Sequence, residues 1–181
     1  MIPKEKMETL ISKEQMQKRI REIAEQINKD YKGKSLLVVG ILKGAVLFFS
    51  DLVRQLNMDV KFDFMTISSY GGSTESTGEV KIRKDLDTSI SGQNVLIVED
   101  IIDTGLTLTS LRALLLTRKP ASFKICCMLD KPSRRKVDIK PDYCCFEIPD
   151  EFVIGYGLDF NQSGRQLEDV CYIKREYIDS L

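Results

Sequence analysis

The chain has 181 residues, and 27 Lys plus Arg balance 27 Asp plus Glu. This length suits one domain with its own hydrophobic core. The zero net charge argues against general nucleic-acid binding, which needs a basic footprint. No signal peptide is visible, and no apolar run approaches the roughly 20 residues that span a bilayer. We therefore expect a cytoplasmic protein with neither nucleic-acid nor membrane partners.

The five cysteines and the lack of histidine limit the possible chemistry. No C-x-x-C spacing occurs, so a zinc site is not expected, and histidine cannot serve as a catalyst. Four cysteines form two adjacent pairs in apolar runs, Cys126-Cys127 and Cys144-Cys145. We interpret them as reduced, packed thiols, because free cysteine behaves as a small buried hydrophobic residue.

Helical and extended patterns alternate in the first part of the chain. Apolar residues recur at helical spacing over residues 12–27, where Ser12 and Gln15 resemble a capping box. A short buried strand over residues 36–39 leads into the turn 40–44, and a second helix over about 45–56 follows. Apolar residues then alternate with polar ones from Val60, as in a strand.

The second part of the chain repeats this alternation. Strands are expected over 94–98, 123–129 and 143–148, a helix over about 107–116, and short extended segments over 152–154 and 170–173. Strands that alternate with helices indicate an α/β fold with a central, mainly parallel sheet flanked by helices. Ligands of such sheets bind beyond the carboxyl ends of the strands, so the segments after strands are the candidate sites.

Residues 68–78 are rich in Gly and Ser and show no periodicity. A short strand with Val80 and Ile82 is expected after them. Loops of this length in a compact domain are usually functional lids or disorder.

The most informative segment follows the strand over 94–98 and has the sequence E-D-I-I-D-T-G-L-T, residues 99–107. Its first two residues, Glu99 and Asp100, are acids at a strand end. A turn then opens a helix, whose free N–H groups and dipole favour a phosphate. Gly105 permits close backbone approach, and the threonine hydroxyls can donate hydrogen bonds. The pattern predicts a phosphate cradle beside acids that face polyol hydroxyls or a metal, and it is neither a Walker A loop nor a Rossmann fingerprint.

Residues 99–107 resemble the phosphoribosyl pyrophosphate (PRPP) motif of the type I phosphoribosyltransferases. Nearly the whole chain is similar to the shorter, bacterial-like hypoxanthine-guanine phosphoribosyltransferases. The resemblance implies the type I fold as a single domain over 1–181, with a core over about 12–145. A hood over about 146–181, with help from the N-terminus, would cover the base.

The resemblance also implies the reaction and its cofactor. The 5-phosphoribosyl group of PRPP would pass to hypoxanthine or guanine, giving IMP or GMP and pyrophosphate in purine salvage, with Mg²⁺ as the cofactor. Asp103 would be the general acid/base at N7 of the base. A homodimer or homotetramer is expected, although the sequence does not choose between them.

Site residues carry over from the resemblance by position. Those expected to bind PRPP and its phosphates are Lys43, Gly44, Ser69, Tyr70, Glu99, Asp100, Asp103, Thr104, Gly105, Leu106, Thr107 and Arg165. Those expected at the base are Lys131, Phe152, Val153 and Asp159. Those expected to support the metal are Glu99, Asp100 and Asp159. The family also carries a cis peptide, which here would join Leu42 and Lys43.

One departure and two alternatives stand beside this interpretation. The family often has bulky or aromatic residues just before the arginine, whereas this chain has Asn161-Gln162-Ser163-Gly164, so we expect Arg165 to be held more loosely. The first alternative is a phosphoribosyltransferase for xanthine or uracil. The second is an RNA-binding regulator that has kept a nucleotide pocket, and the absence of a basic stripe weighs against it.

Overall fold

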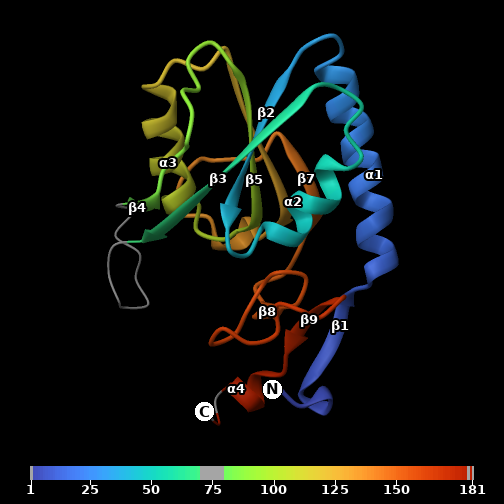
Figure 1. The fold of residues 1–181 in the computed structure, drawn as a ribbon. Coiled ribbons are helices and arrows are strands. Elements are labelled where there is room, and N and C mark those ends of the chain that lie inside the picture. The colour runs from blue at the N-terminus through green and yellow to red at the C-terminus, as the bar shows by residue number, and fades with distance from the viewer. Residues whose placement is uncertain (1, 70–79, 179, 181) are drawn as a thin grey trace.

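The computed structural model describes residues 2–69, 80–178 and 180, and two sheets organise them (Figure 1). The large sheet has six strands in the order β4-β3-β2-β5-β6-β7, and the small one has three in the order β1-β9-β8. In Figure 1 the small sheet lies at one end of the molecule, beside both chain termini. The α/β fold class expected from the sequence is confirmed.

The bounds of the elements follow the sequence patterns closely. The strands of the large sheet are β2 (Leu36–Leu42), β3 (Val60–Ser69), β4 (Val80–Lys84), β5 (Asn94–Ile102), β6 (Ser122–Asp130) and β7 (Tyr143–Glu147). Those of the small sheet are β1 (Met7–Ile11), β8 (Val153–Ile154) and β9 (Val170–Ile173). The helices are α1 (Lys13–Asp30), α2 (Val46–Val53), α3 (Leu106–Leu116) and α4 (Arg175–Ile178), with 3-10 turns η1 (Lys4–Lys6) and η2 (Pro132–Arg134).

The large sheet reverses its strand order beside β2. Every neighbouring pair is parallel except β3 and β4, and the chain passes from β2 to β3 on one side before it returns to β5 on the other. The loops at the carboxyl ends of β2 and β5 therefore diverge from one point. In doubly wound sheets this switch point is where a ligand crevice opens.

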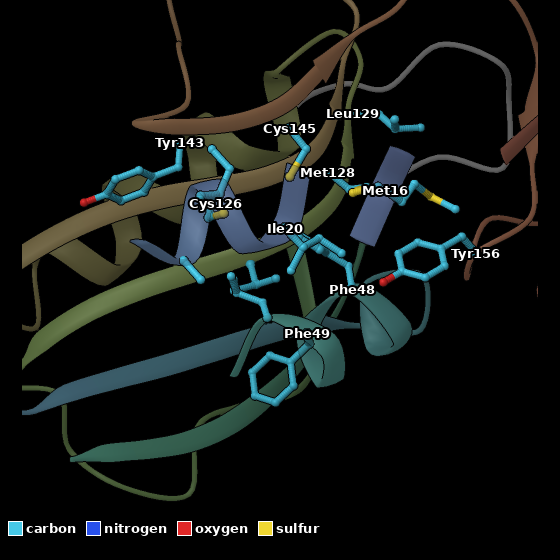
Figure 2. Close-up of a cluster of buried hydrophobic side chains, with 14 of the residues drawn as sticks. Met16, Ile20, Phe48, Phe49, Cys126, Met128, Leu129, Tyr143, Cys145 and Tyr156 are labelled. Carbon is cyan, nitrogen blue, oxygen red and sulfur yellow. The ribbon is translucent and has the colours of Figure 1, made fainter. Parts of the chain in front are cut away.

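Two apolar layers cover the large sheet. On one face, Val38 and Leu96 pack with the buried sides of α1 and α2, together with Met16 and Phe48 (Figure 2). On the other face, neighbouring residues of the same strands pack against α3 and Ile139. The period of two follows from the pleat of strands that are buried on both sides, and it explains their continuous apolar sequences.

The small sheet joins the first strand of the chain to the last. β1 pairs antiparallel with β9, with Met7 opposite Ile173, and β9 pairs with β8. The sheet, α4 and the segment 155–169 between β8 and β9 are called the hood below. Tyr156 attaches the hood to the core, because its ring lies in the α1–α2 cluster and its hydroxyl donates to Asp51 Oδ2 of α2 at 2.6 Å.

The junction between the hood and the core is also the start of α1. Ser12 is the N-cap, and both hydrogen bonds of the predicted capping box with Gln15 are present. Lys13 N also donates to Asp169 Oδ1 at 2.8 Å, which anchors the helix start to the hood. Among the described residues, each helix is either too short or too polar to cross a membrane.

Candidate active site

Two adjoining hollows open at the carboxyl ends of β2 and β5. The first, of about 350 Å³, is lined mainly by residues 41–44 and 99–108. The second, of about 640 Å³, lies between the end of β6 and the hood. Asp100, Asp103 and Asp159 line both hollows, so the two spaces share one acidic boundary.

Two glycines at close approaches shape the wall of the first hollow. At Gly44 a Cβ would lie 1.5 Å from Asp100 Oδ2, so only glycine fits there. At Gly157, where φ is +101°, a Cβ would lie 1.9 Å from the Gly44 carbonyl. The turn after β2, the end of β5 and the hood therefore meet at one residue. A cis peptide joins Leu42 and Lys43 in this turn, as the resemblance implied.

The two acids lie within β5 itself, which extends to Ile102 rather than ending at Val98. Glu99 Oε2 is shielded from water and has no hydrogen-bond partner among the described residues. Removal from water, and then the charge of Asp100, raises the pKa of Glu99 well above its ordinary value. Removal from water also raises the pKa of Asp100 to about 6, against the opposing effect of its hydrogen bond from Ile101 N. The pair therefore has few positive charges and few hydrogen-bond donors nearby to stabilise its ionised form.

Asp103 lies on the turn before α3 and has a different environment. Its Oδ1 accepts from Arg134 Nε at 3.0 Å, and Arg134 also lies 3.5 Å from Asp150. Gly105, with φ of +80°, caps the N-terminus of α3, and its Cβ position is closed by the side chain of Ile139 at 2.6 Å. The turn can therefore present backbone N–H groups to an anion while Asp103 borders the second hollow.

Arg165 is held firmly in the first hollow. It forms an ion pair with Asp159 at 2.6 Å, and it donates to the Gly157 carbonyl at 2.7 Å. Gln162 lies within hydrogen-bonding range of both Arg165 and Lys43, at 3.5 and 3.3 Å. The expectation of a loosely held arginine was therefore wrong, because Gln162, with φ of +64°, turns its own N–H towards Asp159 at 2.7 Å and closes the loop.

The second hollow places a buried lysine among apolar and charged side chains. The side chain of Lys131 is buried, and its Nζ donates to the Glu151 carbonyl at 2.6 Å. Phe152 is 43 % exposed and packs edge-to-face against Phe160 at 5.3 Å. Val153 begins β8 beside it. A flat ring could lie against Phe152 with Lys131 at its edge.

Most of the predicted site residues come together at these hollows. Those that line them are Lys43, Gly44, Glu99, Asp100, Asp103, Thr104, Gly105, Thr107, Lys131, Phe152, Val153, Asp159 and Arg165. Leu106 begins α3 behind the turn and is not among the lining residues. Ser69 ends β3, but its side chain and all of Tyr70 lie outside the described residues, as does the predicted lid. The chemical roles of these residues remain predictions.

Sequence reasoning missed three polar groups at the site. Arg134 on Asp103 and Gln162 between two cations gave no signal, because neither lies in a recognisable motif. Arg135 pairs with buried Asp130 and donates to the Asp103 carbonyl. The adjacent arginines before an exposed loop were the one available hint, and alone they indicate only a solvated surface.

Comparison with known proteins identifies the family. The phosphoribosyl transferase domain family matches residues 7–161. A hypoxanthine-guanine phosphoribosyltransferase of Staphylococcus aureus is 50% identical over 169 residues, which cover 93% of this chain and 94% of that protein. Its counterpart in Bacillus subtilis is 48% identical over 94% and 95% of the two chains. The crystal structure of a Staphylococcus aureus hypoxanthine phosphoribosyltransferase superposes with a TM-score of 0.91 at 49% identity, over 94% of this chain and 92% of that one. The chain belongs to the phosphoribosyltransferase family, in its hypoxanthine-guanine branch.

Proposed function

We propose that the enzyme transfers the 5-phosphoribosyl group of PRPP to hypoxanthine or guanine, releasing pyrophosphate. The observation that carries the proposal is the pair of hollows that share Asp100, Asp103 and Asp159. The polar hollow suits PRPP, and the hollow with Lys131 and Phe152 suits a purine. The ribose C1 would then lie at their common boundary, where the C1–O bond to pyrophosphate breaks and the C1–N9 bond forms.

The first hollow would bind PRPP at both of its ends. Backbone N–H groups at the start of α3, with the threonine hydroxyls beside them, would hold the 5-phosphate. Lys43 and Arg165 would bind the pyrophosphate, which needs positive charge most as it leaves. Ser69 and Tyr70 would begin the lid that keeps water from the ribose cation.

The acids in this hollow fit Mg²⁺ as well as the ribose hydroxyls. Glu99 has an unpartnered shielded oxygen, and removal from water raises the pKa of Asp100. Mg²⁺ keeps several waters and takes substrate phosphates with one or two carboxylates. Asp159 would bind the ion, and Glu99 and Asp100 would support it through waters. The ion would neutralise charge on the departing pyrophosphate.

The second hollow would select and deprotonate the base. Lys131 offers only donors, so it would bind the acceptor oxygen at carbon six of hypoxanthine or guanine and oppose the amino group of adenine. Phe152 would stack on the ring, and the Val153 backbone would meet its edge. Asp103 would accept or share the proton at N7 as the new bond forms at N9. Arg134 would hold the Asp103 carboxylate on the side that faces the base.

An absorbance assay with PRPP and Mg²⁺ tests the proposal, with hypoxanthine, guanine, xanthine, uracil and adenine compared. Hypoxanthine and guanine should turn over, and adenine should be used at least about 10⁴-fold less efficiently. A hydrogen-bonding site can reject the wrong partner by roughly this factor. Xanthine should be the poorest 6-oxopurine, because its oxygen at carbon two would face a backbone carbonyl near Val153. Preferred use of xanthine or uracil would support the alternative branch, and RNA binding without turnover would support a regulator.

A further inference from the structure

Cys127 of β6 and Cys144 of β7 lie side by side in the large sheet. The two residues are direct partners in the parallel ladder. Both side chains pack in the apolar layer that faces α3. Neighbouring strands are about 4.8 Å apart, and disulfides join Cα atoms about 4.4–6.8 Å apart. The two sulfurs can therefore bond with a small movement of the strands.

The two thiols differ in their access to solvent. Cys127 is fully buried in the layer that faces α3. Cys144 is partly buried and lines a separate cavity of about 380 Å³ between β7 and the loop after η2. A small oxidant can reach Cys144 through this cavity, whereas the Cys127 side chain is shielded from solvent.

The electrostatic asymmetry runs in the same direction. The neighbouring Cys127 thiol lowers the pKa of Cys144, with a smaller contribution from Arg19, although burial, Asp130 and Glu147 oppose it. The Cys144 side chain, followed by burial, raises the pKa of Cys127 well above its ordinary value. A more accessible thiol of lowered pKa beside a buried thiol is the arrangement in which one sulfur is oxidised and the other resolves it.

We propose that Cys127 and Cys144 form a reversible disulfide when the protein meets a hydroperoxide. The Cys144 sulfur attacks one peroxide oxygen, the O–O bond breaks, and hydroxide leaves, which gives a sulfenic acid. The Cys127 sulfur then attacks the sulfenic sulfur, the S–S bond forms, and water leaves with the Cys127 proton. The two sulfurs together lose two electrons, and the peroxide gains them.

The disulfide would link the two ends of a segment that lines part of the second hollow. Residues 128–143 connect the two cysteines and include Lys131 and Arg135. Arg135 donates to the Asp103 carbonyl, and Lys136 N donates to the Thr104 carbonyl at 3.0 Å. A shift of β6 against β7 therefore moves the groups that would meet the base, and on the proposed function it should raise the KM for hypoxanthine.

Thiol counting and peptide mapping test the chemistry independently of activity. After hydrogen peroxide treatment and denaturation, the count of free thiols should fall from five to three and return to five with dithiothreitol. Trypsin digestion of the oxidised protein without reductant should release the fragments 125–134 and 137–165 as one cross-linked pair, lighter by two hydrogens than the separate peptides. Five free thiols after treatment, or a sulfinic acid at Cys144 with no cross-link, would overturn the proposal.

Matched variants distinguish the pair from its neighbours. Cys145→Ala removes a buried thiol of the opposite layer, and the cross-link should persist. Cys144→Ser should abolish the cross-link and keep all four remaining thiols. Cys127→Ala should leave a sulfenic acid at Cys144 that dimedone labels. A cross-link that survives Cys144→Ser would assign the chemistry to other cysteines and sink the idea.

Kinetics of the oxidised enzyme test the link to the base. The KM for hypoxanthine should rise reversibly in the wild type and not in Cys144→Ser. An unchanged KM in fully cross-linked enzyme would overturn this link and leave the thiol chemistry intact. Absence of any phosphoribosyl transfer by the reduced enzyme would instead contradict the proposed function.

Discussion

Asp100 and Asp103 lie three residues apart and have opposite electrostatic surroundings. Asp103 already has Arg134 as a partner, whereas Asp100 shares a poorly solvated pocket with Glu99. On the proposed function, Asp103 can exchange a proton with the base because it lies at the open boundary of the two hollows. Asp100 can bind a cation when the ligand arrives because no cation among the described residues pairs with it beforehand.

Asp103→Asn should lower kcat by roughly 10²–10⁴-fold, the usual contribution of a general acid/base. The KM for PRPP should change little, because the amide keeps the shape of the side chain. Steady-state kinetics with hypoxanthine would measure both values, and Asp138→Asn, an exposed residue outside the two hollows, is the control. A large rise in KM with unchanged kcat would make Asp103 a binding residue.

The raised pKa of Asp100 predicts a pH dependence of stability. Because its pKa rises from the ordinary 3.8 to about 6 in the folded protein, its contribution is present below pH 3.8 and is lost as the pH rises through 6. Ligand-free wild type should therefore lose stability relative to Asp100→Asn between about pH 4 and pH 7. Urea unfolding of both proteins across this range measures the difference, and a constant difference would contradict the assignment.

At the scale of elements, the turn after β2 depends on Gly44. Gly44→Ala places a methyl group 1.5 Å from Asp100 Oδ2, so the turn and the acid cannot keep their positions. PRPP binding should be lost while the protein remains folded, as calorimetry and circular dichroism would show. Gly33→Ala is the matched control, because its φ of +73° makes it strained but nothing lies near its Cβ. That variant should lose some stability and keep PRPP binding.

The elements themselves were largely predictable, because their signals are local. The capping box of Ser12 and Gln15 and the continuous apolar strands have one physical interpretation each. β1 was not predicted, because Met7–Ile11 is only partly buried and becomes a strand only by pairing with β9 at the other end of the chain.

The site was predictable where a motif carried it and not where distant segments supply its groups. The composition of residues 99–107 was enough to predict the acids and the phosphate turn. The bond from Arg134 to Asp103, and the place of Gln162 beside Lys43, depend on loops that only the fold brings together. The shifted pKa of Asp100 also follows from packing, since a sequence does not reveal how much water reaches a carboxyl group.

At the scale of the whole molecule, the Tyr156 hydroxyl is one of the groups that join the hood to the core helices. Tyr156→Phe removes the 2.6 Å bond to Asp51 and should lower the free energy of unfolding by about 1 kcal/mol. Tyr172→Phe is the control, since its hydroxyl meets Glu8 on the exposed side of the small sheet. Urea denaturation compares the two, and equal losses would show that the hood is not fastened at Tyr156.

The pairing of β1 with β9 also sets an order for synthesis on the ribosome. All six strands of the large sheet are complete by Glu147, so a nascent chain can already form the phosphate turn. The first strand must wait unpaired until Val170–Ile173 has been made, because that segment is its partner. A chain arrested after Glu147 would carry the large sheet and the phosphate turn but neither Asp159 and Arg165 of the first hollow nor the small sheet. The base side of the site is therefore assembled later than the phosphate turn.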